Sequence, residues 1–118
     1  MIIALPMDEN KKDICVSFGR CPFFLLSDSE SGKQEFIANP AAEATGGAGV
    51  TAAQAVVDGG ADVLITVRCG ENAAEVFKAA DVKIYKSEGP DAQENLRAFA
   101  EGKLSELTKF HAGFHGIR

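Results

Sequence analysis

Three short loops rich in small residues carry the groups best suited to binding an anion. The first, residues 17–21 (SFGRC), opens into an apolar strand, and the second, residues 45–49 (TGGAG), opens into a helix. The third, residues 68–70 (RCG), lies between an apolar run and another helix. Backbone amides at a helix start attract anions, and glycine lets a ligand approach the backbone closely. If the three loops face the same place, they predict a pocket for an anionic ligand.

The loop at 45–49 does not match the common nucleotide-binding motifs. It lacks the lysine of a phosphate-binding loop and the strand-then-GxGxxG context of a dinucleotide site. Arg68 directly follows an apolar run, and ligands of open α/β sheets lie outside the carboxyl ends of parallel strands. Arg68 could pair there with an anion, and Cys69 could contact a metal as a thiolate. The alternatives are a flexible connector at 45–49 and a turn with an incidental thiol at 68–70.

The chain offers little support for catalysis by side chains. Ser17 would need a base held by an orienting group, and the two histidines, His111 and His115, fall in the expected tail. Their i, i+4 spacing suits a metal on a helix, but Gly113 argues against a helix, so we expect solvated tail histidines. A two-metal nuclease needs inward carboxylates on the sheet, and residues 2–5 have none. We therefore predict a protein that is not an enzyme, and in particular not a nuclease or hydrolase.

Composition and charge limit the compartment and the partners. The chain has 118 residues, enough for one domain, and its formal net charge is −5 with no basic run longer than two residues. Nucleic-acid binding through phosphate neutralisation is therefore not expected. No stretch approaches the roughly 20 apolar residues of a membrane span, and no signal peptide is recognised. The three cysteines form an odd, unpatterned set without a disulfide framework, so we expect reduced thiols and a cytoplasmic protein.

Apolar patterns and turn signals predict the order β-β-β-β-α-β-α-β-α, with the second strand doubtful. The first half reads as strand 2–5, the doubtful strand 14–16 and a hairpin over 22–38. In the second half, helices alternate with a buried strand at 63–67 and a strand closer to an edge at 82–85. An antiparallel start followed by βαβ units predicts an α/β fold, a mixed five-stranded sheet with helices on both faces.

The expected helices carry apolar stripes over 50–57, 73–80 and 92–100. The last of them has the clearest boundaries. Asp91, with a glutamate three residues later, resembles a capping box, and Gly102 is well placed to end the helix in a left-handed conformation.

The order and spacing of several motifs resemble the nitrogenase iron–molybdenum cofactor-binding and biosynthesis proteins, including small single-domain members. The motifs are IIALP at 2–6, FGRCPFF at 18–24, GGAGV at 46–50, GADVLI at 60–65 leading to CG at 69–70, VKIY at 82–85 and GKL at 102–104. The resemblance covers residues 1–105, which we expect to form the cofactor-binding domain. Residues 106–118 are expected to be a flexible tail.

The resemblance implies a ribonuclease H-like, three-layer fold without nuclease activity. It also implies a carrier or assembly role for an anionic metal–sulfur cluster, either an iron–sulfur or an iron–molybdenum type, with the cluster and cluster-assembly proteins as partners. Glycine-loop amides and arginines suit such an anion. The candidate cofactor contacts are Ser17, Phe18, Gly19, Arg20, Thr45, Gly46, Gly47, Gly49, Arg68 and Gly70.

The residue before the Phe-Gly pair distinguishes two interpretations. Family members commonly place a histidine ligand there, and this chain has Ser17. Cys15, Cys21 and Cys69 are candidate metal ligands in its place, since thiolates are the usual ligands of iron–sulfur clusters. The alternative interpretation is a protein-interaction or regulatory domain that keeps the fold without a cofactor. Ser17 favours the alternative, whereas the cysteines and the glycine loop favour cluster binding.

Overall fold

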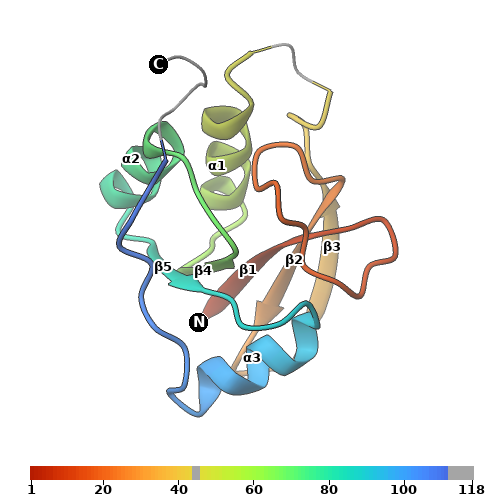
Figure 1. Cartoon of the computed structure of the whole chain (residues 1–118). Helices are drawn as coiled ribbons and strands as arrows, with labels where there is room; N and C mark the ends of the chain where they lie inside the picture. The colour runs from red at the N-terminus through yellow and green to blue at the C-terminus, as the bar shows by residue number, and fades with distance from the viewer. Residues whose placement is uncertain (44–45, 112–118) are drawn as a thin grey trace.

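The computed structural model of the chain describes residues 1–43 and 46–111. Its centre is a mixed five-stranded sheet of order β3-β2-β1-β4-β5 (Figure 1). The strands are β1 (Ile2–Met7), β2 (Phe23–Asp28), β3 (Gln34–Ala38), β4 (Val63–Thr66) and β5 (Lys83–Lys86). The pairs β1–β2 and β2–β3 are antiparallel, whereas β4 is parallel to both β1 and β5. The predicted hairpin and the predicted mixed sheet are both confirmed.

The doubtful strand at 14–16 is not a strand. Ile14 makes only an isolated antiparallel bridge to Met7, and Asp13 makes another to Asp91. A polar turn precedes this segment, with the amide of Asp8 donating to the carbonyl of Asp13 at 2.9 Å. The segment is therefore the start of a long loop between β1 and β2, and not a sixth element of the sheet.

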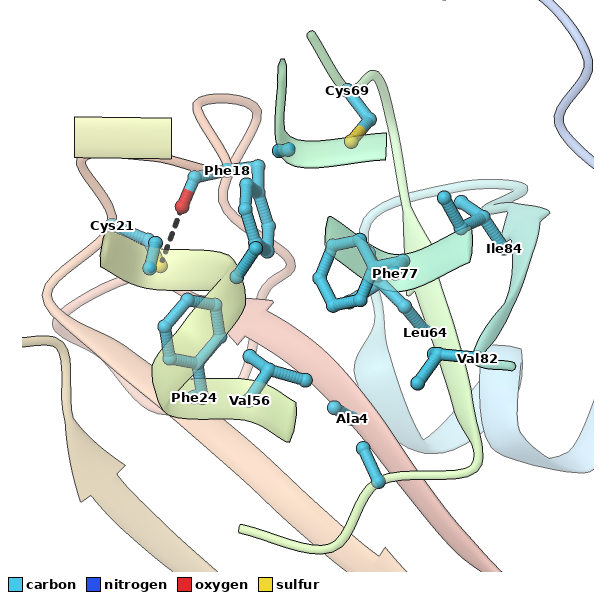
Figure 2. Close-up of a cluster of buried hydrophobic side chains, with 14 of the residues drawn as sticks. Ala4, Phe18, Cys21, Phe24, Val56, Leu64, Cys69, Phe77, Val82 and Ile84 are labelled. Atoms are coloured by element: carbon cyan, nitrogen blue, oxygen red, sulfur yellow. Dashed lines mark hydrogen bonds between the residues drawn. The ribbon is translucent and has the colours of Figure 1, made fainter. Parts of the chain in front are cut away.

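Three helices cover the two faces of the sheet: α1 (Ala48–Asp58), α2 (Glu71–Ala79) and α3 (Ala92–Ala100). Helices α1 and α2 lie together on one face and α3 lies on the other (Figure 1). Strand residues alternate between the two apolar cores, as the period of two in a β-strand requires. Ala4, Phe24 and Leu64 pack under α1 and α2 (Figure 2), whereas the next residue of each strand packs under α3: Leu5, Leu25 and Ile65.

The predicted boundaries of α3 are confirmed by its hydrogen bonds. The Asp91 carboxylate accepts from the amide of Glu94 at 3.0 Å, and Gly102 has a φ of 74° just beyond the helix. The Glu94 amide and the nearby Lys12 ammonium together hold the pKa of Asp91 below its usual range. Among the described residues, no helix is long and apolar enough to cross a lipid bilayer.

The edge of β5 is occupied by the chain that follows α3. The amide of Lys86 donates to the carbonyl of Ser105, and the amide of Leu107 donates to the carbonyl of Ile84, both at 2.8 Å. We call residues 104–111 the strap. The first part of the expected tail, from residue 106 to 111, therefore lies along the sheet, where it satisfies backbone groups that an edge strand would otherwise expose. Residues 112–118 lie outside the described residues.

Candidate functional site

The three predicted loops meet around one pocket of about 660 Å³. The pocket lies where the chain leaves the carboxyl ends of β1 and β4, the edge at which open α/β sheets bind ligands. Of the predicted cofactor contacts, its lining includes Ser17, Phe18, Gly19, Arg20, Gly46, Gly47, Gly49, Arg68 and Gly70. Thr45, the remaining predicted contact, lies outside the described residues.

The charged side chains of this pocket are opposite in sign to the net charge of the whole molecule. Its described lining contains Arg20, Arg68 and His111 but no aspartate or glutamate, although the chain has a formal net charge of −5. Helix α1 begins at the pocket with Ala48 and has neither a side-chain cap nor an acidic residue in its first turn. The partial positive charge of a helix start adds to that of the arginines. The arrangement favours an anionic ligand.

Glycine allows a close approach where the first loop meets α1. A Cβ on Gly19 would lie 3.2 Å from the amide nitrogen of Gly49, tighter than an ordinary contact, so a side chain there would push the loop and the helix start apart. Gly47, which precedes α1, has a φ of 67°, in the left-handed region that glycine adopts without strain. These two glycines bring the loop and the helix start to the same pocket.

Phe18 anchors the first loop in the core. Its side chain is buried, and its ring centroid lies 5.4 Å from that of Phe24 and 5.6 Å from that of Phe77 (Figure 2). Phe18 therefore joins β2 to α2 through apolar contacts while its neighbours Ser17 and Gly19 face the pocket.

Asn39, which directly follows β3, holds the first loop in place. Its buried amide group donates to the carbonyl of Gly19 at 3.1 Å and to the carbonyl of Cys21 at 2.8 Å. Its side-chain oxygen accepts from the amide of Ala41 at 2.9 Å. Because the partners are 18 and 20 residues away, no local pattern points to this role.

The three cysteines do not line the pocket. Cys21 and Cys69 are buried in the apolar core under α1 and α2 (Figure 2), and burial raises the pKa of each thiol to about 12. Cys15 is half-buried, and burial raises its pKa as well. All three thiols lie near backbone carbonyls, and that of Cys21 donates to the carbonyl of Phe18 at 3.3 Å. Across residues 1–43 and 46–111, no group of three or more His, Cys, Asp or Glu could hold a metal ion.

His111 is a residue of the site that the sequence did not reveal. We expected a solvated tail histidine, and its side chain is indeed exposed, but the strap holds it at the rim of the pocket. The carbonyl of His111 accepts from the amide of Glu71 at 2.8 Å, next to the start of α2. His115 lies outside the described residues.

A larger groove of about 1080 Å³ runs between α2, β5 and the strap. Its lining mixes lysines with the carboxylates of Glu71, Glu75, Asp81 and Glu106, and includes none of the predicted cofactor contacts. By size alone this groove would be favoured over the smaller pocket as a ligand site, but a lining of mixed charge does not favour an anion. The smaller pocket therefore remains the candidate site.

Comparisons with known proteins identify the family of this chain. Residues 1–102 match the family described as dinitrogenase iron–molybdenum cofactor. A protein of Methanocaldococcus jannaschii, MJ0580, is 34% identical over 110 residues, which cover 91% of this chain and 92% of the relative. The solved structure of a NifB-like protein from Thermotoga is 39% identical, with a TM-score of 0.76 over 92% of this chain and 95% of that one.

The apo form of the orange protein from Desulfovibrio gigas is also similar in structure. It is 28% identical, with a TM-score of 0.83 over 90% of this chain and 92% of that one. The family match extends over nearly all the described elements, from β1 to the end of α3. The chain belongs to the dinitrogenase iron–molybdenum cofactor family.

Proposed function

We propose that this protein carries a preassembled, anionic metal–sulfur cluster, of an iron–sulfur or iron–molybdenum type, and delivers it without chemical conversion. The observation that carries the proposal is the charge of the pocket. Two arginines and the start of α1 face it, and no carboxylate is among its described lining residues. A cluster with a sulfide surface is an anion that such donors suit.

The donor set favours a cluster over a single metal ion. A bound zinc or iron ion takes three or four protein ligands, usually Cys, His, Asp or Glu. The described lining offers one residue of that kind, His111, beside hydrogen-bond donors such as Ser17 and Asn72. A cluster brings most of its own metal ligands as sulfide, so it needs hydrogen-bond donors and positive charge more than a full set of ligands.

The burial of Cys21 and Cys69 favours a packing role over metal ligation. To bind a metal at the pocket, Cys21 and Cys69 would have to leave the core, where burial raises the pKa of each thiol to about 12 and keeps it protonated. We therefore assign them to packing and no longer to the cluster. Free cysteines that form no disulfide suit a reducing compartment, so we place the carrier in the cytoplasm.

The test is anaerobic reconstitution with iron, sulfide and molybdate, followed by desalting, a visible spectrum and metal analysis. We expect stoichiometric metal and charge-transfer bands in the wild type. Arg68→Ala should lower retention by about tenfold or more, the loss expected when a charge-assisted hydrogen bond is removed. Arg97→Ala is the matched control, because Arg97 lies on α3, on the opposite face of the sheet.

A colourless, metal-free wild type would overturn the proposal and favour the cofactor-free interaction domain. An equal loss in Arg68→Ala and Arg97→Ala would also count against the pocket, because it would mean that only overall charge matters. Arg68→Lys should keep more cluster than Arg68→Ala, since it preserves the charge while losing the paired donors.

A further inference from the structure

We propose that His111, on the strap, coordinates a metal atom of the bound cluster at the rim of the pocket. The inference rests on the proposed function and adds to it the residue that fixes the cluster in one orientation. Hydrogen-bond donors hold an anion by its surface, whereas a metal ligand bonds to one atom of it. Three observations support His111 in this role: its fixed backbone, the space made for its ring and the chemistry of the residues around it.

The main chain of His111 is paired on both sides. It forms a parallel bridge with Gly70, its amide donates to the carbonyl of Cys69 at 3.3 Å, and its carbonyl accepts from the amide of Glu71 at 2.8 Å. The preceding part of the strap is held by the edge of β5 and by Leu104, which is buried under α3. A side chain carried on a fixed element can be held in the geometry that coordination requires.

Gly70 leaves space for the imidazole ring. A Cβ on Gly70 would lie 3.2 Å from Cε1 of His111, tighter than an ordinary contact. The backbone of Gly70 has a φ of −79° and a ψ of 161°, an extended conformation that any residue adopts. The glycine is therefore not needed for its conformational freedom at this position. What it provides is room for the His111 ring beside the start of α2.

The other lining residues cannot take the place of an imidazole. Arg20 and Arg68 donate hydrogen bonds but have no lone pair to give a metal, and the same holds for backbone amides. Ser17 and Asn72 offer a hydroxyl and an amide, which are weak ligands for iron or molybdenum in a sulfide environment. Imidazole is the commonest metal ligand among side chains. Within the described lining, His111 is the residue suited to a metal bond.

The experiment uses the full chain loaded with iron, sulfide and molybdate under anaerobic conditions. The loaded protein is challenged with an iron chelator, and the rate of cluster loss is followed by visible absorbance. His111→Ala should lose the cluster at least about tenfold faster, the lower end of the loss seen when groups supporting a metal ligand are removed. His111→Ala keeps the main-chain groups through which residue 111 pairs with Cys69 and Glu71.

Two further samples separate coordination from a structural effect. Lys109→Ala, the matched control, removes an exposed side chain from the same strap that lines neither cavity, and it should lose the cluster at the wild-type rate. Free imidazole added to His111→Ala should occupy the vacated position and slow the loss again. If the ring had only a structural role, free imidazole would not slow the loss.

Each outcome decides between the two proposals. A wild type that binds no cluster overturns the proposed function, and this inference with it. A wild type that binds while His111→Ala loses the cluster at the same rate overturns the coordination alone and leaves the carrier function standing. Faster loss that imidazole does not reverse also overturns coordination, because the ring would then act by packing. Faster loss with rescue supports it.

Discussion

Replacement of Asn39 by alanine should weaken the candidate pocket indirectly, by releasing the first loop that lines it. Asn39 does not line the pocket, yet its amide group donates to two carbonyls of the first loop, at Gly19 and Cys21. Its side-chain oxygen accepts from the amide of Ala41. Alanine fits the backbone at this position, because Asn39 is not among the residues with a positive φ.

The expected cost follows from these three hydrogen bonds. A buried intramolecular hydrogen bond contributes about 1 kcal/mol net, so Asn39→Ala should lower the free energy of unfolding by about 3 kcal/mol. In urea, where a domain of this size loses about 1.5 to 2 kcal/mol per molar denaturant, the midpoint should fall by about 1.5 to 2 M. The freed loop should also hold the cluster less tightly, because Gly19 and Arg20 lose their fixed position against α1.

Asn95 provides a matched control on the other side of the sheet. It is also buried, and its side chain accepts from the amide of Glu88 at 2.7 Å and donates to the carbonyls of Gly89 and Asp91 at 3.1 and 2.8 Å. Asn95→Ala should therefore cost a similar free energy of unfolding while leaving cluster retention at the wild-type level. Urea titrations would compare the free energies of unfolding of the two variants. Reconstitution under conditions in which both variants remain folded would compare their cluster retention.

The reasoning would be refuted by either of two results. If Asn39→Ala lowers the free energy of unfolding by less than about 0.5 kcal/mol, its hydrogen bonds are replaced by water and do not hold the loop. If Asn39→Ala and Asn95→Ala impair retention equally, the effect comes from general instability and not from the position of the loop.

Two other predictions concern a glycine contact and the buried thiols. Gly19→Ala should weaken cluster retention, because its Cβ would lie 3.2 Å from the backbone of α1. Gly59→Ala is the control, because its Cβ would be crowded by Leu26, 2.9 Å away, at the end of α1 that does not line the pocket; below the onset of unfolding it should bind as the wild type does, and equal losses would contradict the close approach. For Cys21 and Cys69, burial raises the pKa of the folded thiols to about 12, above an unfolded value of about 8.5. Their contribution to stability is therefore fully present below about pH 8.5 and is lost as the pH rises toward 12, because the unfolded chain ionises first. Urea midpoints should fall more steeply above about pH 9 in the wild type than in a Cys21→Ala, Cys69→Ala variant, and parallel curves would show that other groups dominate. In native protein near pH 8, iodoacetamide should label the half-buried Cys15 before the other two.

Local sequence signals were sufficient for the helices, for every strand except the doubtful one at 14–16, and for most of the pocket lining. The hairpin over 22–38, the apolar stripes of the helices and the cap at Asp91 each depend on residues a few positions apart, so a single segment contains the whole signal. The loops could also be brought together by topology, since the carboxyl ends of β1 and β4 meet at the same edge of the sheet. Arg68 and the glycines at 46–49 were found in this way.

The missed or misplaced residues depend on contacts between distant segments. Asn39 and His111 act through partners far along the chain, and neither position differs in composition from an ordinary loop. The argument that Gly113 breaks a helix was not informative for His111, because the strap reaches the pocket as extended chain. The orientation of Cys21 and Cys69 could not be predicted either, since the short loops at 17–21 and 68–70 have no periodicity to show which side chain points inward.

The contrast between the pocket and the rest of the surface has a consequence for how an anion would arrive. At a distance the cargo meets a molecule of net charge −5 and is repelled, whereas at contact it meets arginines and a helix start. Dissolved salt screens charges beyond a Debye length of about 10 Å at 0.1 M and weakens short contacts much less. Moderate ionic strength should therefore speed the capture of the cargo, the reverse of ordinary electrostatic steering.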